Sequence, residues 1–198
     1  VEHRKGVGML TGEVGCGKTT VIRALLDFLD NNHYQFHLIS RPALQPTDLL
    51  RAILLKLGGS AENGSKTDLL DRLHRHLYQN AEKGLSTILA IDEAHVIGNQ
   101  ATLDELRMLL NEQSDDDFLI PLILLGQPPL LENISELQPL KERISIKYNL
   151  EPLDLQSTLN YILHRLKWAG ATRGIFSREA IQVLYEFSEG LPLRINNL

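Results

Sequence analysis

Residues 11–20 read TGEVGCGKTT, and the glycines, lysine and threonines of this stretch decide the fold. Gly12 and Gly17 are separated by four residues and are followed by Lys18 and Thr19, which is the G-x-x-x-x-G-K-[ST] spacing of a phosphate-binding loop. Glycine loses much conformational entropy on folding and adds no packing, so such a run needs a function that requires exposed backbone. A glycine-rich turn with a solvated lysine is the alternative interpretation.

The segments that flank the loop support the phosphate-binding interpretation. An apolar run around Val7–Leu10 precedes it, and apolar residues recur at helical spacing from Val21 to Leu29 after it. When a glycine loop lies between a strand and a helix, its backbone N–H groups and the positive end of the helix can surround a phosphate. We expect Lys18 to contact the β and γ phosphates and the Thr19 hydroxyl to bind Mg²⁺. The predicted nucleotide-binding residues of the loop are Gly12, Glu13, Val14, Gly15, Cys16, Gly17, Lys18, Thr19 and Thr20.

The overall composition excludes few classes of protein. A net charge of −5 provides no global basic field for nucleic acid, but it leaves a local basic patch open. The single cysteine, Cys16, excludes an intrachain disulfide framework and favours a reducing, cytoplasmic location. The apolar run FLIPLILLG (118–126) is too short for a membrane span. Because the chain starts at Val1 and ends inside a predicted helix, we expect further segments beyond both ends, and these can include a membrane anchor.

Strands and helices alternate along most of the chain. Further strands are predicted at 35–40, 85–91, 118–127 and 144–150, and helices at 47–57, 67–84 and 99–113. This alternation implies right-handed crossovers and a parallel sheet with helices on both faces, which is a three-layer αβα fold. Only helices are predicted after Leu153. We therefore expect an α/β nucleotide-binding base domain at 1–150 and a helical lid at 151–198.

Two acidic residues follow the apolar strand that ends at Ile91. A buried parallel strand delivers side chains of this kind to the carboxyl edge of its sheet. We predict that Asp92 holds Mg²⁺ through its water shell and that Glu93 orients and deprotonates the attacking water. A surface acidic pair is the alternative interpretation. Gln127 follows the next core strand, where it would contact the γ-phosphate or help to orient the water, unless it is a turn residue before Pro128 and Pro129.

These motifs together resemble AAA+ ATPases. The resemblance rests on GEVGCGKT, ILAIDE, the polar residue at a strand end, an arginine before the last strand, and GLPLRINN among the C-terminal helices. IDEAH, LLGQPPL, RISIKYNLEPLD and GLPLRINNL are further similar to the ExeA-like group, which includes secretion-pathway ATPases and relatives encoded beside transposases. The resemblance covers essentially the whole chain.

The resemblance implies a sheet order of 5-1-4-3-2, ATP as the nucleotide and self-association into a ring or filament. It also implies that Arg143 is an arginine finger, which reaches the γ-phosphate bound by a neighbouring subunit, and that Arg194 is a lid arginine, which contacts nucleotide in its own subunit. An ordinary surface cation is the alternative interpretation of both residues.

The family resemblance leaves more than one biological role open. The leading hypothesis is a helper of transposition that assembles on double-stranded DNA and recruits a transposase. The alternative is an accessory ATPase of type II secretion or pilus assembly, with envelope proteins as partners. A nucleotide-gated assembly module with little hydrolysis is an alternative of another class. A helicase is disfavoured, because the residues after Leu150 are too few for a second nucleotide-binding domain. A small-molecule kinase is disfavoured too, because it would carry a lid that binds its substrate in place of the three helices predicted after Leu153.

Overall fold

Two compact units make up the chain in the computed structural model, which describes residues 6–30, 32–40, 42, 44–62, 64–111, 113–114, 117–135 and 137–198. One unit combines residues 1–11 with 19–148, and the other combines residues 12–18 with 149–198. The glycine loop thus groups with the C-terminal helices. The domain boundary predicted after residue 150 stays a prediction.

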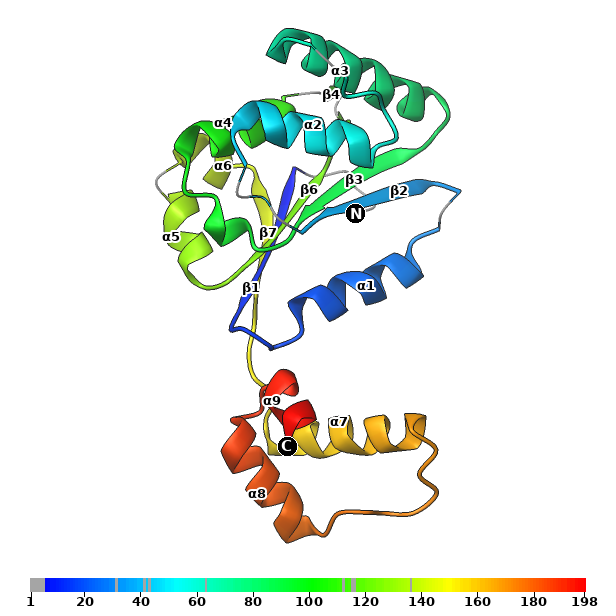
Figure 1. The fold of residues 1–198 in the computed structure, drawn as a ribbon, viewed down its shortest axis with the longest axis vertical. Coiled ribbons are helices and arrows are strands. Elements are labelled where there is room, and N and C mark those ends of the chain that lie inside the picture. The colour runs from blue at the N-terminus through cyan, green and yellow to red at the C-terminus, as the bar shows by residue number, and fades with distance from the viewer. Residues whose placement is uncertain are drawn as a thin grey trace. The chain divides into compact units, whose positions relative to one another are not determined.

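A five-stranded parallel sheet confirms the predicted α/β fold. Its strands are β1 (Val7–Gly12), β2 (Tyr34–Ile39), β3 (Ser86–Ile91), β6 (Leu122–Gly126) and β7 (Ile144–Leu150). Their spatial order, β7-β1-β6-β3-β2, is the predicted 5-1-4-3-2 order (Figure 1). Thr11 pairs with Gly126 and Ile91 pairs with Leu124, so β1, β3 and β6 end at one edge of the sheet.

Four longer helices accompany the sheet, namely α1 (Lys18–Phe28), α2 (Pro46–Lys56), α3 (Lys66–Glu82) and α4 (Gln100–Leu109). Figure 1 shows the sheet between α1 and the layer formed by α2, α3 and α4. Local sequence sets where these helices begin. Ser65 and Asp68 form a capping box at the start of α3, and the Asn99 side chain accepts a hydrogen bond from the Ala101 N–H at the start of α4.

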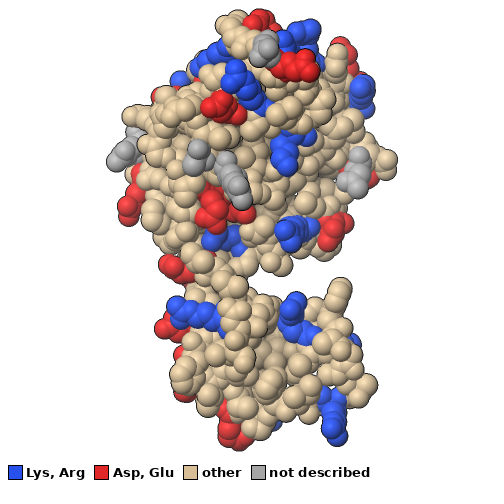
Figure 2. Space-filling view, in the orientation of Figure 1, with Lys and Arg blue, Asp and Glu red and all other residues tan. Residues whose placement is uncertain are grey.

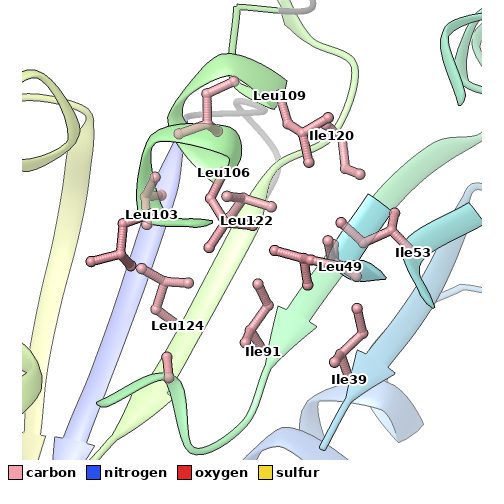
Figure 3. Packing of buried hydrophobic residues seen from close by; sticks show 14 of the residues in the cluster. Ile39, Leu49, Ile53, Ile91, Leu103, Leu106, Leu109, Ile120, Leu122 and Leu124 are labelled. Carbon is pink, nitrogen blue, oxygen red and sulfur yellow. The ribbon is translucent and has the colours of Figure 1, made fainter. Parts of the chain in front are cut away.

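The main hydrophobic core lies between this helical layer and the sheet (Figure 3). Apolar residues of α2 and α4 recur every three or four positions and therefore point to one side. Leu106 of α4 and Leu122 of β6, for example, are 0% and 1% exposed. Burial of each such side chain contributes about 1.5–3 kcal/mol, which holds the carboxyl edge of the sheet in a rigid frame.

The structure differs from the predicted elements between residues 109 and 142. The helix predicted at 99–113 ends at Leu109, and Gln113–Ser114 (β4) pairs antiparallel with Asp117–Phe118 (β5). The strand predicted at 118–127 is interrupted at Pro121, which has no N–H for a sheet hydrogen bond, so β6 begins at Leu122. Two short helices, α5 (Pro129–Ser135) and α6 (Gln138–Lys141), were not predicted.

The C-terminal part of the second unit is helical, as predicted. It contains α7 (Leu155–Trp168), α8 (Arg178–Ser188) and α9 (Pro192–Asn197), with Ile162, Ile181 and Ile195 in their common core. The Asp154 carboxylate accepts a hydrogen bond of 2.7 Å from the Ser157 N–H at the start of α7, and this bond lowers the pKa of Asp154 below its usual value. Within the described ranges, no helix is both long enough and apolar enough to cross a bilayer.

Candidate functional site

The glycine loop of the second unit brings backbone into contacts that a side chain would prevent. A Cβ atom at Gly12 would lie 2.6 Å from the Leu150 carbonyl oxygen. Gly15 has a φ of +82°, in the left-handed region that favours glycine, and a Cβ atom there would lie 2.5 Å from Cβ of Leu193. The Leu193 N–H also donates a hydrogen bond of 3.1 Å to the Gly15 carbonyl. The loop conformation therefore explains both glycines.

Lys18 lies inside this loop and is only 6% exposed. Its Nζ atom donates hydrogen bonds to the carbonyl oxygens of Gly12 at 2.8 Å and Glu13 at 3.0 Å. A third, longer contact joins Nζ to the Cys16 sulfur at 4.0 Å. An ammonium group has three donors and no acceptor, so an anion can replace this weak contact or a carbonyl. Among the other predicted loop residues, Cys16 is buried, whereas Glu13, Val14 and Thr20 are exposed.

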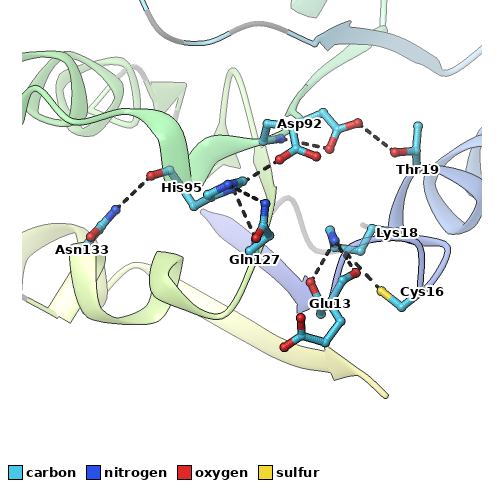
Figure 4. Close-up of polar contacts among 10 residues, drawn as sticks. Glu13, Cys16, Lys18, Thr19, Asp92, His95, Gln127 and Asn133 are labelled. Carbon is cyan, nitrogen blue, oxygen red and sulfur yellow. Dashed lines mark hydrogen bonds and ion pairs between the residues drawn. The ribbon is translucent and has the colours of Figure 1, made fainter. Parts of the chain in front are cut away.

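In the first unit, Thr19 and Asp92 form a direct pair, the Thr19–Asp92 pair (Figure 4). The Thr19 hydroxyl donates a hydrogen bond of 2.8 Å to Oδ2 of Asp92, which is 8% exposed. The Glu93 N–H donates to Oδ1 of Asp92 at 2.9 Å, so both carboxylate oxygens are held in place. One hydroxyl and one carboxylate that face each other fit Mg²⁺, which takes a few protein oxygens and keeps several waters.

Glu93 follows Asp92 in an unusual backbone conformation. Its φ of 54° and ψ of 34° are left-handed, which costs roughly 1–2 kcal/mol for a residue other than glycine. This conformation begins the short 3-10 turn η1 (Ala94–Val96) and leaves the Glu93 side chain 47% exposed. Its Oε2 atom lies 3.4 Å from Nδ1 of His95. The Glu93 carboxylate therefore lies beside the His95 ring.

His95 also contacts Gln127 (Figure 4). Together with Glu93, these residues form the Glu93–His95–Gln127 group. The Gln127 amide nitrogen lies 2.9 Å from Nε2 of His95, and the Gln127 main-chain N–H donates to Nδ1 at 3.3 Å. The Asn133 side chain donates to the His95 carbonyl at 3.1 Å, which fixes the turn. The sequence reasoning did not assign His95 a role, although its place three residues after Asp92 was a usable signal.

The two predicted arginines have partners within their own units. Arg143 donates to the carbonyl oxygen of Arg107 at 2.9 Å and to Oδ1 of Asn111 at 2.5 Å, so it caps the carboxyl end of α4. Arg194 is half-exposed and forms an ion pair with Glu189 on the same unit. The finger and lid roles of Arg143 and Arg194 stay predictions.

Comparison with known families agrees with this geometry. Residues 1–134 match the AAA domain family. The chain belongs to the AAA domain family of P-loop ATPases.

One curated relative of this AAA domain is the general secretion pathway protein A of Aeromonas hydrophila. The two are 37% identical over 196 residues, which is 96% of this chain but only 35% of that protein. The AAA domain described here thus spans a minor part of that relative's length.

Solved structures share the fold of this AAA domain. The Aeropyrum pernix ORC1 protein, solved in complex with DNA, matches with a TM-score of 0.76 at 18% identity, over 98% of this chain and 52% of that one. CDC6p from Pyrobaculum aerophilum matches with a TM-score of 0.73 at 21% identity, over 96% of this chain and 50% of that one. At these identities the likeness shows the fold alone, and it confirms the predicted AAA+ architecture.

Proposed function

We propose that this AAA domain binds and hydrolyses Mg·ATP. The observation that carries the proposal is the hydrogen bond of 2.8 Å between the Thr19 hydroxyl and Asp92. It joins the residue that directly follows Lys18 in the phosphate-loop motif to the carboxylate at the end of a buried strand. A structural glycine turn or a surface acidic pair would not require these two side chains to meet.

Each residue of the candidate site has a role in this proposal. The backbone N–H groups of the glycine loop and the Lys18 ammonium group would bind the β and γ phosphates. Thr19 and Asp92 would hold Mg²⁺, which neutralises phosphate charge when bound. Asp92 is already oriented by two hydrogen bonds, so little reorganisation is needed.

Glu93 would act on the attacking water in the same mechanism. Its half-exposed carboxylate can accept a hydrogen bond from water. It can then take the proton that the water loses as the water oxygen bonds to the γ-phosphorus, while the bond from that phosphorus to the β–γ bridging oxygen breaks and ADP leaves. Base catalysis of this kind contributes on the order of 10²–10⁴ in rate. Gln127 would donate a hydrogen bond from its amide to the γ-phosphate. This contact would form with ATP but not with ADP, which has no γ-phosphate.

Assembly would complete the site through the predicted arginine finger. For Arg143 to reach a nucleotide on a neighbouring subunit, its guanidinium group must leave the Arg107 carbonyl and Asn111. The end of α4 would then lose a cap, so assembly and the conformation of α4 are expected to be linked. Arg194 would similarly exchange Glu189 for nucleotide.

The comparisons favour the secretion role over the transposition role that was the leading hypothesis. The identity of 37% to general secretion pathway protein A supports the alternative hypothesis, an accessory ATPase of type II secretion or pilus assembly. The comparisons give the transposition hypothesis no support. On the face drawn in Figure 2, Lys and Arg side chains are interspersed with Asp and Glu rather than gathered in a stripe, which gives DNA binding no added support.

Glu93→Gln tests the proposed activity. The amide keeps the size of the side chain but cannot take a proton, so we expect ATP affinity to stay within about threefold while turnover falls on the order of 10²–10⁴-fold. The matched control is Glu132→Gln, which changes an exposed glutamate in α5 and should hydrolyse ATP like the parent. Phosphate release with saturating Mg·ATP is the measurement. Equal turnover in Glu93→Gln and the parent would remove Glu93 from the mechanism.

A further inference from the structure

His95 contacts both Glu93 and Gln127. Its side chain is 13% exposed, whereas that of Glu93 is 47% exposed, so His95 is the more buried of the two. Gly126, at the end of β6, makes room for its backbone: a Cβ atom there would lie 3.2 Å from the His95 nitrogen. The backbone therefore holds His95 against the residue that follows β6.

The contacts of the ring cannot all be made at once. Nδ1 lies 3.4 Å from the Glu93 carboxylate, which accepts only, and 3.3 Å from the Gln127 main-chain N–H, which donates only. Nδ1 satisfies the carboxylate only when it carries a proton, and it satisfies the N–H only when it does not. In a neutral ring only one nitrogen carries a proton. Nε2 is therefore unprotonated when Nδ1 is protonated, and protonated when Nδ1 is not.

The orientation of the Gln127 side-chain amide decides which ring nitrogen of His95 carries the proton. When the NH₂ group of Gln127 faces Nε2, as it does here at 2.9 Å, Nε2 accepts, so in a neutral ring Nδ1 carries the proton and faces the Glu93 carboxylate at 3.4 Å. When the NH₂ group turns to a phosphate, the amide oxygen faces the ring instead, and Nε2 must then carry the proton. Nδ1 then accepts the Gln127 main-chain N–H and releases Glu93.

From this arrangement we propose that His95 is a positioning residue that couples the γ-phosphate contact of Gln127 to release of the Glu93 carboxylate. The proposal rests on the proposed ATP hydrolysis. With the Gln127 amide in the orientation that the structure shows, Nδ1–H holds Glu93. Binding of a triphosphate turns the Gln127 amide, one proton leaves Nδ1 for solvent and another binds Nε2, and the ring stays neutral. Glu93 is then free to accept the proton of the attacking water.

The ring nitrogens themselves report this change without turnover. In a chain with ¹⁵N-labelled histidine at pH 8, the protonated and unprotonated ring nitrogens have well-separated chemical shifts. The sequence has 7 histidines, so the His95 signals are assigned by their loss in His95→Gln. We expect the proton on Nδ1 in the free chain and with Mg·ADP, and on Nε2 with a Mg-bound non-hydrolysable ATP analogue. The same tautomer in all three states would overturn the proposal, and so would a proton on Nε2 in the free chain.

Kinetics separate a failure of this proposal from a failure of the proposed function. On this proposal, Gln127→Ala leaves Glu93 held by Nδ1–H and should lower kcat about tenfold with little change in KM, whereas His95→Ala leaves Glu93 free at all times and should turn over close to the parent. The double variant His95→Ala/Gln127→Ala should therefore turn over faster than Gln127→Ala, because without the ring nothing holds Glu93. His164→Ala, an exposed histidine of α7, is the matched control.

The outcomes of the kinetic series are distinct. If Glu93→Gln is inactive but the double variant is no faster than Gln127→Ala, the coupling role is wrong and the ATPase proposal stands. If the His95→Ala and Gln127→Ala losses multiply in the double variant, the two residues act independently and the coupling role is again wrong. If the parent and Glu93→Gln show the same turnover, the proposed function itself fails.

Discussion

The Thr19–Asp92 pair and the Glu93–His95–Gln127 group lie in the same compact unit but are built differently. In the pair, the two side chains meet directly at 2.8 Å, and the second carboxylate oxygen of Asp92 is bound by a main-chain N–H. In the group, Glu93 and Gln127 both contact His95, at distances between 2.9 and 3.4 Å.

This difference separates a preorganised site from an adjustable one. Fixed oxygens at the pair suit a metal ion, because they need no rearrangement when charge arrives. The group has two exclusive hydrogen-bond arrangements, so it can respond to a ligand. Metal binding would therefore be constant, while water activation would depend on which nucleotide is present.

Among the substitutions that compare the pair with the group, removal of the Thr19 hydroxyl should lower turnover most. Thr19→Val keeps the shape of the side chain but leaves the oxygen of Asp92 without its donor, so we expect turnover to fall roughly tenfold to a hundredfold. Thr19→Ser retains the hydroxyl and should stay within about threefold of the parent. Turnover at saturating Mg·ATP is the measurement. Equal rates for the Val and Ser variants would show that the pair does not contribute.

A substitution in the Glu93–His95–Gln127 group should lower turnover less than Thr19→Val does. Gln127→Leu removes the amide that contacts His95, and we expect kcat to fall about tenfold, with a KM close to that of the parent. Gln182→Leu, an exposed glutamine in α8, is the matched control. An unchanged kcat in Gln127→Leu would mean that Gln127 is only a turn residue before the two prolines, which is the alternative considered from sequence.

The smallest expected effect concerns the backbone of Glu93. Both Glu93→Ala and Glu93→Gly lose the carboxylate, but only glycine adopts the left-handed conformation without steric cost. We therefore expect the glycine variant to be more stable than the alanine variant by about 1 kcal/mol in urea unfolding. A more stable alanine variant would show that the left-handed conformation at this position is not maintained.

The sequence predicted much of this architecture because the deciding signals are local. The spacing of Gly12, Gly17 and Lys18 marks the loop, and the apolar run into Asp92 marks the strand that delivers the carboxylate. The sheet order came from family resemblance rather than from spacing, because nothing in a single strand specifies its neighbour.

Other features depend on contacts that a single sequence does not display. Strands of two residues, such as β4, and the four-residue helix α6 are too short to show a period. The partners of Arg143 lie 32 and 36 positions away in the chain. His95 could have been suspected from its motif, but its link to Gln127 requires the pairing of β3 with β6.

The most direct test of the account is the Mg²⁺ dependence of ATP affinity in the parent and in Asp92→Asn. The asparagine keeps an acceptor for Thr19 but removes the negative charge that a metal ion needs. We predict that the parent binds ATP more tightly with Mg²⁺ than with EDTA, while Asp92→Asn binds with the parent's EDTA affinity under both conditions. An Asp92→Asn variant that keeps the full Mg²⁺ enhancement of the parent would contradict the assignment of Asp92 to the metal.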